Sequence, residues 1–171
     1  GKKMNNFKSI KPSDIEDNVF RLISKDWMLV TAGAPGSFNT MTASWGGLGH
    51  LWNRDVCFIF IRPSRHTYNF LESSRAFTLS FFSENYRPIL KLCGSKSGKD
   101  IDKIGATGLT PVESAAGNVY FSEARLVIEC TTIYSQDILP ELFLDPGIAS
   151  NYPGGDYHRL YTGEIKSVLT R

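Results

Sequence analysis

Residues 39–52 gather the residue types that suit a bound ligand. The hydroxyl side chains of Thr40, Thr42 and Ser44 alternate with apolar ones, so a strand here would place the hydroxyl groups on one face. A glycine-rich turn bracketed by two tryptophans follows. Backbone N–H groups, hydroxyl groups and an exposed ring together suit a flat ligand with polar edges. The alternative is an ordinary strand and turn, which would explain the alternation alone.

A second candidate site lies at residues 62–67, Arg-Pro-Ser-Arg-His-Thr, directly after an apolar stretch. Arg62 and Arg65 flank Ser64, which can begin a helix. Arginine side chains and the N–H groups at a helix N-terminus both favour an anion. The segment therefore predicts a phosphate site, and a solvated loop with a capping serine is the alternative interpretation.

Other polar stretches carry weaker signals. Residues 95–99, Ser-Lys-Ser-Gly-Lys, lack the spacing of a phosphate-cradling loop, so a flexible surface loop is the favoured interpretation. His158 stands near the start of a strand without a partner that would make a catalytic triad. The three cysteines and three histidines are widely scattered, which gives no metal-binding pattern.

The composition is that of one globular domain. The chain has 171 residues, of which 42% are hydrophobic and 21% charged, and its net charge is +2. That charge is too small to favour nucleic acid or an anionic membrane, and no apolar run approaches the roughly 20 residues that span a bilayer. Three sparse cysteines predict reduced thiols and a cytoplasmic location. We expect one domain over residues 1–171, with residues 1–12 as a mobile arm.

Hydrophobic periodicity predicts the elements that position these residues. Strands are expected at residues 27–32, 38–45, 56–61, 76–82, 119–134 and 157–169, with a glycine turn after residue 45 and a loop at 145–156. Helices are expected from residue 13 or 17 to 25, after Ser64, at 85–93 and within 135–144, with one helical turn at 100–103. Many strands and few helices indicate a closed or partly open antiparallel barrel.

Four segments, taken in order, resemble a known family. They are residues 39–46 (NTMTASWG), 56–67 (VCFIFIRPSRHT), 93–103 (CGSKSGKDIDK) and 158–165 (HRLYTGEI). Together they are similar to the flavin reductase-like, FMN-binding split-barrel family, and most to its flavoredoxin-type branch. The resemblance implies a mainly β fold with short helices, built as a six-stranded antiparallel Greek-key split barrel. It also implies a homodimer with FMN near the subunit interface.

The resemblance assigns the candidate cofactor-binding residues by position. The first segment would contact the isoalloxazine ring and ribityl chain of FMN, the second would contact its phosphate end, and the third would form the family's second cofactor-binding loop. These residues are Asn39, Thr42, Ala43, Ser44, Trp45, Arg62, Arg65, Thr67, Ser97, Lys99 and Lys103. His158, followed by Gly163 and Glu164, matches the family's C-terminal His-x4-Gly-Glu pattern, which lies near the nicotinamide in reductases.

Two positions depart from the family's pattern. His66 stands where relatives often have a tyrosine, which bears on the packing around the phosphate. Tyr157 separates Asp156 from His158, whereas reductases that read Gly-Asp-His have these residues adjacent. The second departure concerns nicotinamide binding more than flavin binding.

Three classes of function follow from the resemblance. The first is an NAD(P)H-dependent flavin or FMN oxidoreductase, and the second is a flavoredoxin-like FMN electron carrier reduced by a partner protein. The third is a module that sequesters flavin. FMN is expected in preference to FAD, and a homodimer is expected to cover an apolar cluster of Trp45, Leu48, Leu51 and Trp52.

In the oxidoreductase class, FMN would accept a hydride and the protein would supply no covalent catalyst. Backbone N–H groups of residues 42–45 would contact the edge of the ring, and Lys99 or Lys103 would stabilise negative charge that develops on it. His158 would position the nicotinamide. Cys57 would be a buried strand residue, and Cys93 and Cys130 would be dispensable.

Overall fold

The structure is a computed structural model, and it describes residues 6–171. Its strands are β1 (Lys8–Ile10), β2 (Met28–Ala34), β3 (Ser37–Ala43), β4 (Gly46–Leu51), β5 (Arg54–Ile61), β6 (Ala76–Phe81), β7 (Pro111–Glu113), β8 (Val119–Phe121), β9 (Leu126–Asp137) and β10 (Arg159–Thr170). The α-helices are α1 (Val19–Arg21), α2 (His66–Ser74), α3 (Arg87–Ser95) and α4 (Lys103–Thr107). Shorter helical turns are Pro12–Asp14, Leu22–Asp26, Glu84–Tyr86, Pro140–Leu142 and Pro146–Asn151.

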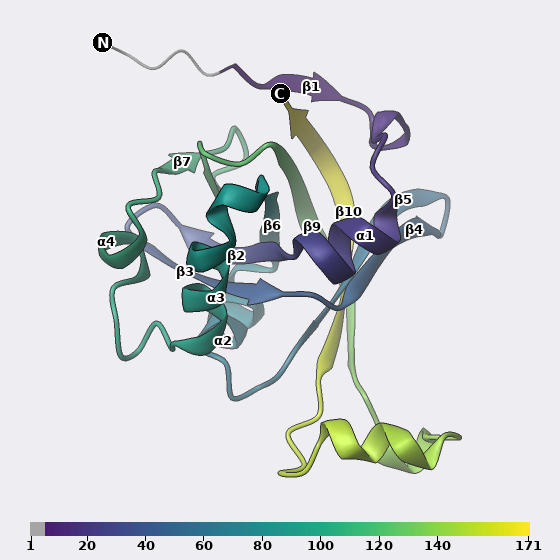
Figure 1. The fold of residues 1–171 in the computed structure, drawn as a ribbon. Helices are drawn as coiled ribbons and strands as arrows, with labels where there is room; N and C mark the ends of the chain where they lie inside the picture. Colours follow the sequence, from purple (N-terminus) through teal and green to yellow (C-terminus); the bar gives the residue numbers. More distant parts are fainter. Residues whose placement is uncertain (1–5) are drawn as a thin grey trace.

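Eight of the described strands form one antiparallel sheet that curves around the core, with short helices at its side (Figure 1). The strand order is β3-β2-β6-β9-β10-β5-β4, with β1 added to β10, and β7 pairs with β8 in a separate small sheet. The predicted fold class, a mainly β antiparallel split barrel with short helices, is confirmed. The sheet has two more strands than the six expected, because β1 and β4 form where the sequence predicted an arm and a turn.

The glycine-rich residues that follow Trp45 form a strand, so the prediction of a turn there is wrong. Strand β4 pairs with β5, from Gly46 opposite Ile59 to Leu51 opposite Arg54. A Cβ atom at Gly46 would lie 2.5 Å from the carbonyl oxygen of Phe58, so glycine lets the two backbones approach closely. The turn comes later, at residues 52 and 53, whose φ angles of 53° and 57° suit a tight two-residue hairpin.

The described part of residues 1–12, which was expected to be an arm, packs on the barrel. Strand β1 pairs with β10, and the ring of Phe7 packs edge-on against Tyr120 with 5.7 Å between centroids. The guanidinium of Arg171 lies 4.5 Å from the centroid of the Phe7 ring. Apolar and cation–π contacts therefore fix this segment, while residues 1–5 lie outside the described part of the chain.

Several helix boundaries differ from the predicted ones. Helix α1 begins after Asn18, whose side chain accepts the N–H of Arg21, and Phe20 points into solvent. Ser64 does not cap α2, because its hydroxyl donates to the carboxylate of Asp156 and Arg65 occupies the N-cap position. Helix α3 has a proline in its first turn, as predicted. The turn expected at residues 100–103 appears later, as α4.

The segment between β9 and β10 projects from the barrel as an arm (Figure 1). Residues 138–158 make up this arm, and they carry the helical turns Pro140–Leu142 and Pro146–Asn151. The short helix expected within residues 135–144 is present as the turn Pro140–Leu142, and it starts late because β9 continues to Asp137. The loop predicted at residues 145–156 also contains more regular structure than expected. The arm matters for function because its C-terminal end leads into β10 beside the candidate site.

The side chains around Gly163 leave no room for a larger residue. A Cβ atom at this position of β10 would lie 2.6 Å from Cζ of Phe77 and 2.8 Å from Cβ of Cys130. Both neighbours are fully buried, as is Cys57, which confirms its prediction as a buried strand residue. Glycine therefore lets β10 lie flat against the core between β5 and β9.

Gly163→Ala is expected to lower the free energy of unfolding by about 1–3 kcal/mol, because the added methyl group overpacks the core. Gly154→Ala is the matched control, since a Cβ atom there meets nothing within 4 Å. Urea unfolding followed by tryptophan fluorescence measures both. Equal stability of the two variants would contradict the packing argument.

Candidate functional site

A pocket of about 200 Å³ opens between the end of β3, the end of β5 and the start of β10. Seven predicted site residues line it: Thr42, Ala43, Ser44, Trp45, Arg62, Arg65 and His158. The sequence analysis missed two others, Met41 and Phe60. Both belong to strands whose position was predicted, but the uniformly apolar run that contains Phe60 did not show which face it would take. Three of the four segments that resemble the family therefore meet in space at this pocket.

On the side of the pocket next to β3, the strand is anchored to a helix and an aromatic ring is exposed. The hydroxyl of Thr42 donates to the carbonyl oxygen of Leu90 in α3, so this side chain anchors β3 to the helix. Ser44 and Trp45 connect β3 to β4 and lie outside both strands. The Trp45 side chain is 49% exposed, and its ring lies 5.2 Å from that of His158. This side thus offers an aromatic surface beside a polar edge.

Arg62 fastens the projecting arm to the pocket. Its Nη1 donates to the carbonyl oxygen of Asp156 at 2.9 Å, and its Nη2 donates to that of Asn151 at 2.8 Å. The guanidinium also lies 4.7 Å from the centroid of the Tyr152 ring. In this arrangement both terminal nitrogens of Arg62 bind backbone of the arm, so its first role is to hold the arm in place.

His158 is held neutral and oriented by the arm. Its Nδ1 shares a hydrogen bond of 2.6 Å with the hydroxyl of Tyr152, and both side chains are buried. Burial and the positive charge of Arg62 lower the pKa of His158 to about 4, against the opposite effect of Asp156. The ring is therefore uncharged at neutral pH. It can orient a ligand but carries no proton to give away there.

The start of α2 packs against the loop that follows α3. Asn39 and Thr67 are both buried, and Nδ2 of Asn39 donates to the Thr67 hydroxyl at 2.7 Å. A Cβ atom at Gly98 would collide with Oδ1 of Asn39 and lie 3.1 Å from Cδ2 of His66, so the loop backbone touches both. The Nδ1 atom of His66 is buried with no hydrogen-bond partner. An unpaired buried nitrogen at the start of a helix indicates a position where a ligand atom could form a hydrogen bond with it.

Lys103 is buried behind the pocket without a carboxylate partner. Its Nζ donates to the carbonyl oxygens of Thr40 at 2.6 Å and Cys93 at 3.0 Å. Burial lowers the pKa of Lys103 to about 8, with Cys93 raising it and Arg65 lowering it. Among the ion pairs of the described residues, none involves Lys103 or Arg65. This region therefore carries unbalanced positive charge.

The remaining predicted residues do not line the pocket. Asn39 and Thr67 form a hydrogen bond with each other beside it, and Lys103 lies behind it. Ser97 and Lys99 lie in the loop after α3, where the Ser97 hydroxyl accepts the N–H of Lys99 at 3.2 Å. The structure brings this loop against the start of α2 and not to the ring of Trp45. It thus separates the predicted set into a pocket lining and a cationic region next to it.

The described residues contain no arrangement typical of metal or nucleophilic catalysis. No group of three or more His, Cys, Asp or Glu residues within 6–171 could hold a metal ion. All three cysteines are buried and reduced, and Sγ of Cys57 lies 3.1 Å from Sγ of Cys130. Burial raises the pKa of Cys130 and of Cys93, so neither favours the reactive thiolate.

Comparison with known proteins agrees with this geometry. The profile of the flavin reductase like domain matches residues 20–171, so the chain belongs to the flavin reductase-like domain family. No curated protein sequence matches the chain significantly. Within the described residues, no helix is long and apolar enough to cross a membrane.

Solved structures show the same fold at low sequence identity. One is an FMN-binding protein from Thermus thermophilus with bound p-hydroxybenzaldehyde, 19% identical, with a TM-score of 0.69 over 96% of this chain and 82% of that chain. Another is flavoredoxin of Desulfovibrio vulgaris (Miyazaki F), 23% identical, with a TM-score of 0.68 over 95% and 77%. A third is flavin reductase PheA2 in its native state, 15% identical, with a TM-score of 0.61 over 85% and 79%. At these identities, the similarity establishes the fold.

The lowered pKa of His158 predicts a defined loss of stability in acid. Between the ordinary pKa of 6.5 and the folded value of about 4, the unfolded chain binds a proton that the folded chain does not. The free energy of unfolding of the wild type should therefore fall as the pH drops through this window. His158→Gln, which cannot titrate, should lose less stability between pH 7 and pH 4.5. Urea unfolding at both pH values measures the difference, and an equal loss in both proteins would refute it.

Proposed function

We propose that this protein binds FMN in the pocket and transfers a hydride from NADH or NADPH to the flavin. The observation that carries the proposal is the meeting of residues 42–45, Arg65 and His158 at one pocket, beside the start of α2. These residues come from segments far apart in the chain, and the family match spans all of them. A barrel that needed them only for packing would not leave a pocket among them.

The cationic region next to the pocket fits the phosphate end of FMN. Arg65 and Lys103 supply positive charge without carboxylate partners, and α2 begins here with N–H groups that have no partner inside the helix. The unpaired Nδ1 of His66 adds a further polar atom at the same helix start. A buried polar atom without a partner costs about 1–3 kcal/mol, which a phosphate oxygen would offset. Nothing in the sequence suggests a second site for an adenine, so FMN is favoured over FAD.

The lining of the pocket fits a flavin ring. Met41, Phe60 and the exposed ring of Trp45 provide apolar surface, and the backbone of residues 42–45 provides polar groups. Bound FMN would supply the electron-accepting ring. The chain's own contribution is to bind and orient. His158 is uncharged and fixed by Tyr152, so it serves to position the nicotinamide.

Arg65→Ala is expected to weaken FMN binding by about 1.5–3 kcal/mol, because a hydrogen bond to a charged phosphate is lost. Riboflavin lacks the phosphate, so its affinity should be the same in variant and wild type. Arg54→Ala is the control, since Arg54 pairs with Glu164 on another part of the sheet and does not line the pocket. Titration calorimetry measures all the affinities. Equal losses for FMN and riboflavin would place the phosphate elsewhere.

The activity is tested by mixing the FMN-loaded protein with NADH and with NADPH without oxygen, and following the bleaching of the flavin. Rapid bleaching by either one supports the proposed oxidoreductase. A variant with Ser at Cys57, Cys93 and Cys130 that still folds should be reduced at a near-normal rate, because no thiol takes part. Bleaching by a reduced protein partner but by neither nucleotide would establish the electron-carrier function instead.

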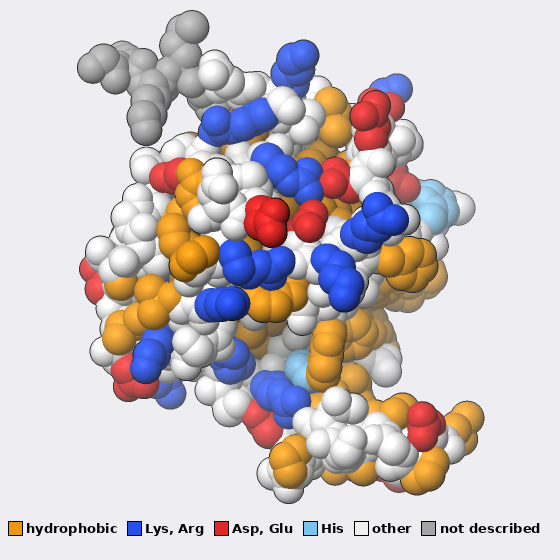
Figure 2. Space-filling model, viewed as in Figure 1, with side chains coloured by type: hydrophobic (Ala, Val, Ile, Leu, Met, Phe, Trp, Pro, Cys, Tyr) orange, Lys and Arg blue, Asp and Glu red, His pale blue; other side chains and the backbone are white. Residues whose placement is uncertain are grey.

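We also propose a homodimer. Besides Phe20 on α1 and Trp45 at the flavin pocket, large apolar side chains are exposed at Trp52 and Tyr134 and, on the arm, at Leu139, Leu142 and Leu144. Leu144 is 98% exposed, and Figure 2 shows apolar side chains along the arm. The arm also carries Tyr152, which fixes His158, so a partner that covers the arm would stabilise the site. Apolar surface of this kind is costly in water and marks an interface.

Changing both Leu142 and Leu144 to Lys should convert the dimer into a monomer, because two charges would replace apolar contacts at the interface. Analytical ultracentrifugation at micromolar concentration measures the mass. Phe20→Lys is the control, since Phe20 is also an exposed apolar residue but lies on α1, away from the arm. A wild type that sediments as a monomer with FMN bound would remove the dimer.

A further inference from the structure

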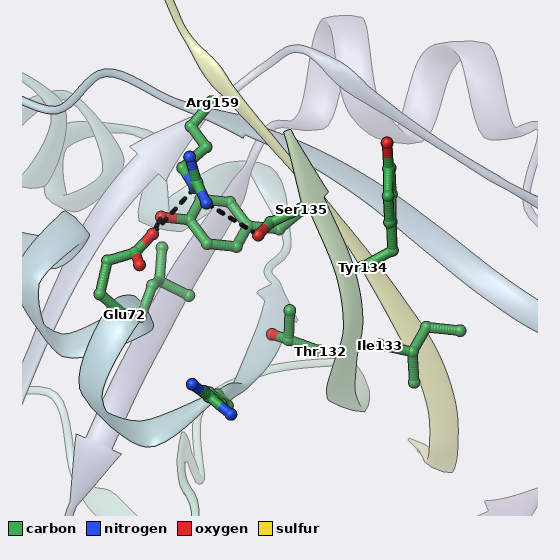
Figure 3. A pocket seen from close by; sticks show the side chains of 9 residues that line it. Glu72, Thr132, Ile133, Tyr134, Ser135 and Arg159 are labelled. Atoms are coloured by element: carbon green, nitrogen blue, oxygen red, sulfur yellow. Dashed lines mark hydrogen bonds and ion pairs between the residues drawn. The ribbon is translucent and has the colours of Figure 1, made fainter. Parts of the chain in front are cut away.

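A second pocket, of about 260 Å³, lies between the end of α2, β9 and the start of β10. Figure 3 shows the side chains that line it, and none of them lines the flavin pocket. The two pockets are nevertheless neighbours in the chain, because His158 lines one and Arg159 lines the other. Helix α2 likewise begins at the flavin pocket and ends at this one.

One wall of this second pocket is a network of polar side chains. The hydroxyl of Tyr161 donates to Oε1 of Glu72 at 2.6 Å, and Nε of Arg159 lies 3.0 Å from the same oxygen (Figure 3). Nη2 of Arg159 donates to the Ser135 hydroxyl at 3.1 Å. Burial and the nearby Glu72 raise the pKa of Tyr161, so this hydroxyl keeps its proton. Arg159 thus pairs with Glu72 on one side, and its Nη1 also donates to Oδ1 of Asp137 at 2.8 Å on the other.

The opposite side of the pocket carries polar groups that have no hydrogen-bond partner among residues 6–171. The hydroxyl of Thr132 is buried with no hydrogen-bond partner, and Figure 3 shows it pointing from β9 toward α2. Arg75 has no side-chain hydrogen bond or ion pair among residues 6–171. Oε2 of Glu72 is also without a partner there, since both of its contacts use Oε1. Arg159 pairs with both Glu72 and Asp137, so Arg75 is the cation of the lining that has no carboxylate partner among the described residues.

The backbone of Arg75 adds an independent observation. This residue ends α2 with φ 52° and ψ 31°, a left-handed conformation that usually falls to glycine or asparagine. Its carbonyl oxygen accepts the N–H of Thr132 at 2.9 Å, so a backbone hydrogen bond holds Arg75 next to Thr132. A non-glycine residue in this conformation costs free energy, and such strain clusters at functional sites.

We propose that this second pocket binds a small hydroxycarboxylate. Its carboxylate would accept hydrogen bonds from the guanidinium of Arg75 and from the Thr132 hydroxyl, which is buried and has no other acceptor. Its hydroxyl group would donate to Oε2 of Glu72. Glu72 and Arg75 are both exposed, so a ligand would exchange their water for direct contacts. A simple anion would make no contact with Oε2, and a neutral amide would bring no charge opposite Arg75. The proposal does not depend on flavin binding, because the two pockets share no lining residue.

The test uses the full chain with lactate as the probe and lactamide as its uncharged counterpart, followed by NMR shifts of backbone amides. Lactate should cause saturable shifts at Arg75 and Thr132, and lactamide should bind at least tenfold more weakly. Arg54→Gln, on another part of the sheet, should bind lactate like the wild type. Equal binding of lactate and lactamide, or no saturable shift with lactate, would overturn the proposal.

Two variants separate binding from folding. Arg75→Gly should weaken lactate binding at least tenfold yet raise the urea midpoint, because glycine adopts the left-handed conformation freely. Thr132→Val should also weaken binding and raise the midpoint, because it removes an unpaired buried hydroxyl. Arg75→Gln removes the charge without adding glycine, so it tests the charge alone if Arg75→Gly loosens the end of α2. It should also weaken lactate binding. Variants that bind lactate as tightly as the wild type would show that these residues serve the fold only.

Discussion

The structure depends on the close packing of β10 between β5 and β9. Each outer strand pairs with β10 along most of its length, and β1 adds to the far end of β10. This arrangement is compatible only with a residue as small as glycine at position 163, where Phe77 and Cys130 already fill the space. Because β10 is fixed so tightly, its first residues are fixed too. Arg159, the first residue of β10, therefore lines its pocket from a fixed strand, and His158 directly precedes it at the end of the arm.

The proposed flavin site illustrates how a protein keeps positive charge available for an anion. Lys103 and Arg65 both donate to the carbonyl oxygen of Cys93, near the C-terminal end of α3, where cations are favoured by the helix dipole. These contacts position the cations without neutralising them, since carbonyl oxygens carry no net charge. Burial then makes the charged form of Lys103 less stable, which its lowered pKa reports. A bound phosphate would reverse that effect and so bind more strongly than at a neutralised site.

The arm links the proposed cofactor site to the proposed dimer. Arg62 holds the arm through two backbone carbonyl oxygens, and Tyr152 of the arm in turn holds His158. The leucines on the outside of the arm are exposed in a single chain. A partner subunit that covered them would therefore restrain the same segment that orients His158. Cofactor binding and dimer formation would then stabilise one another, because both require an ordered arm.

The sequence by itself determined the elements whose signals are local. The apolar run before Arg62, the alternation at residues 39–44 and Pro88 at the start of α3 placed strands and a helix correctly. The order of four segments determined the family and most residues of the pocket lining. These signals are readable because side-chain periodicity and proline act within a few residues of the chain. The match to solved folds then confirmed the split barrel as a whole.

Only the tertiary structure decided which groups face one another across the sheet. It made residues 46–51 a strand, because their glycines can lie against the ring and backbone of Phe58. It turned Arg62 toward the arm and Lys103 toward two carbonyl oxygens, although both had been expected at the cofactor. It also brought Arg75 and Thr132 together in a second pocket that no sequence motif indicated. Such contacts depend on a strand order that does not follow the chain, with β6 between β2 and β9, so no local pattern in the sequence could record them.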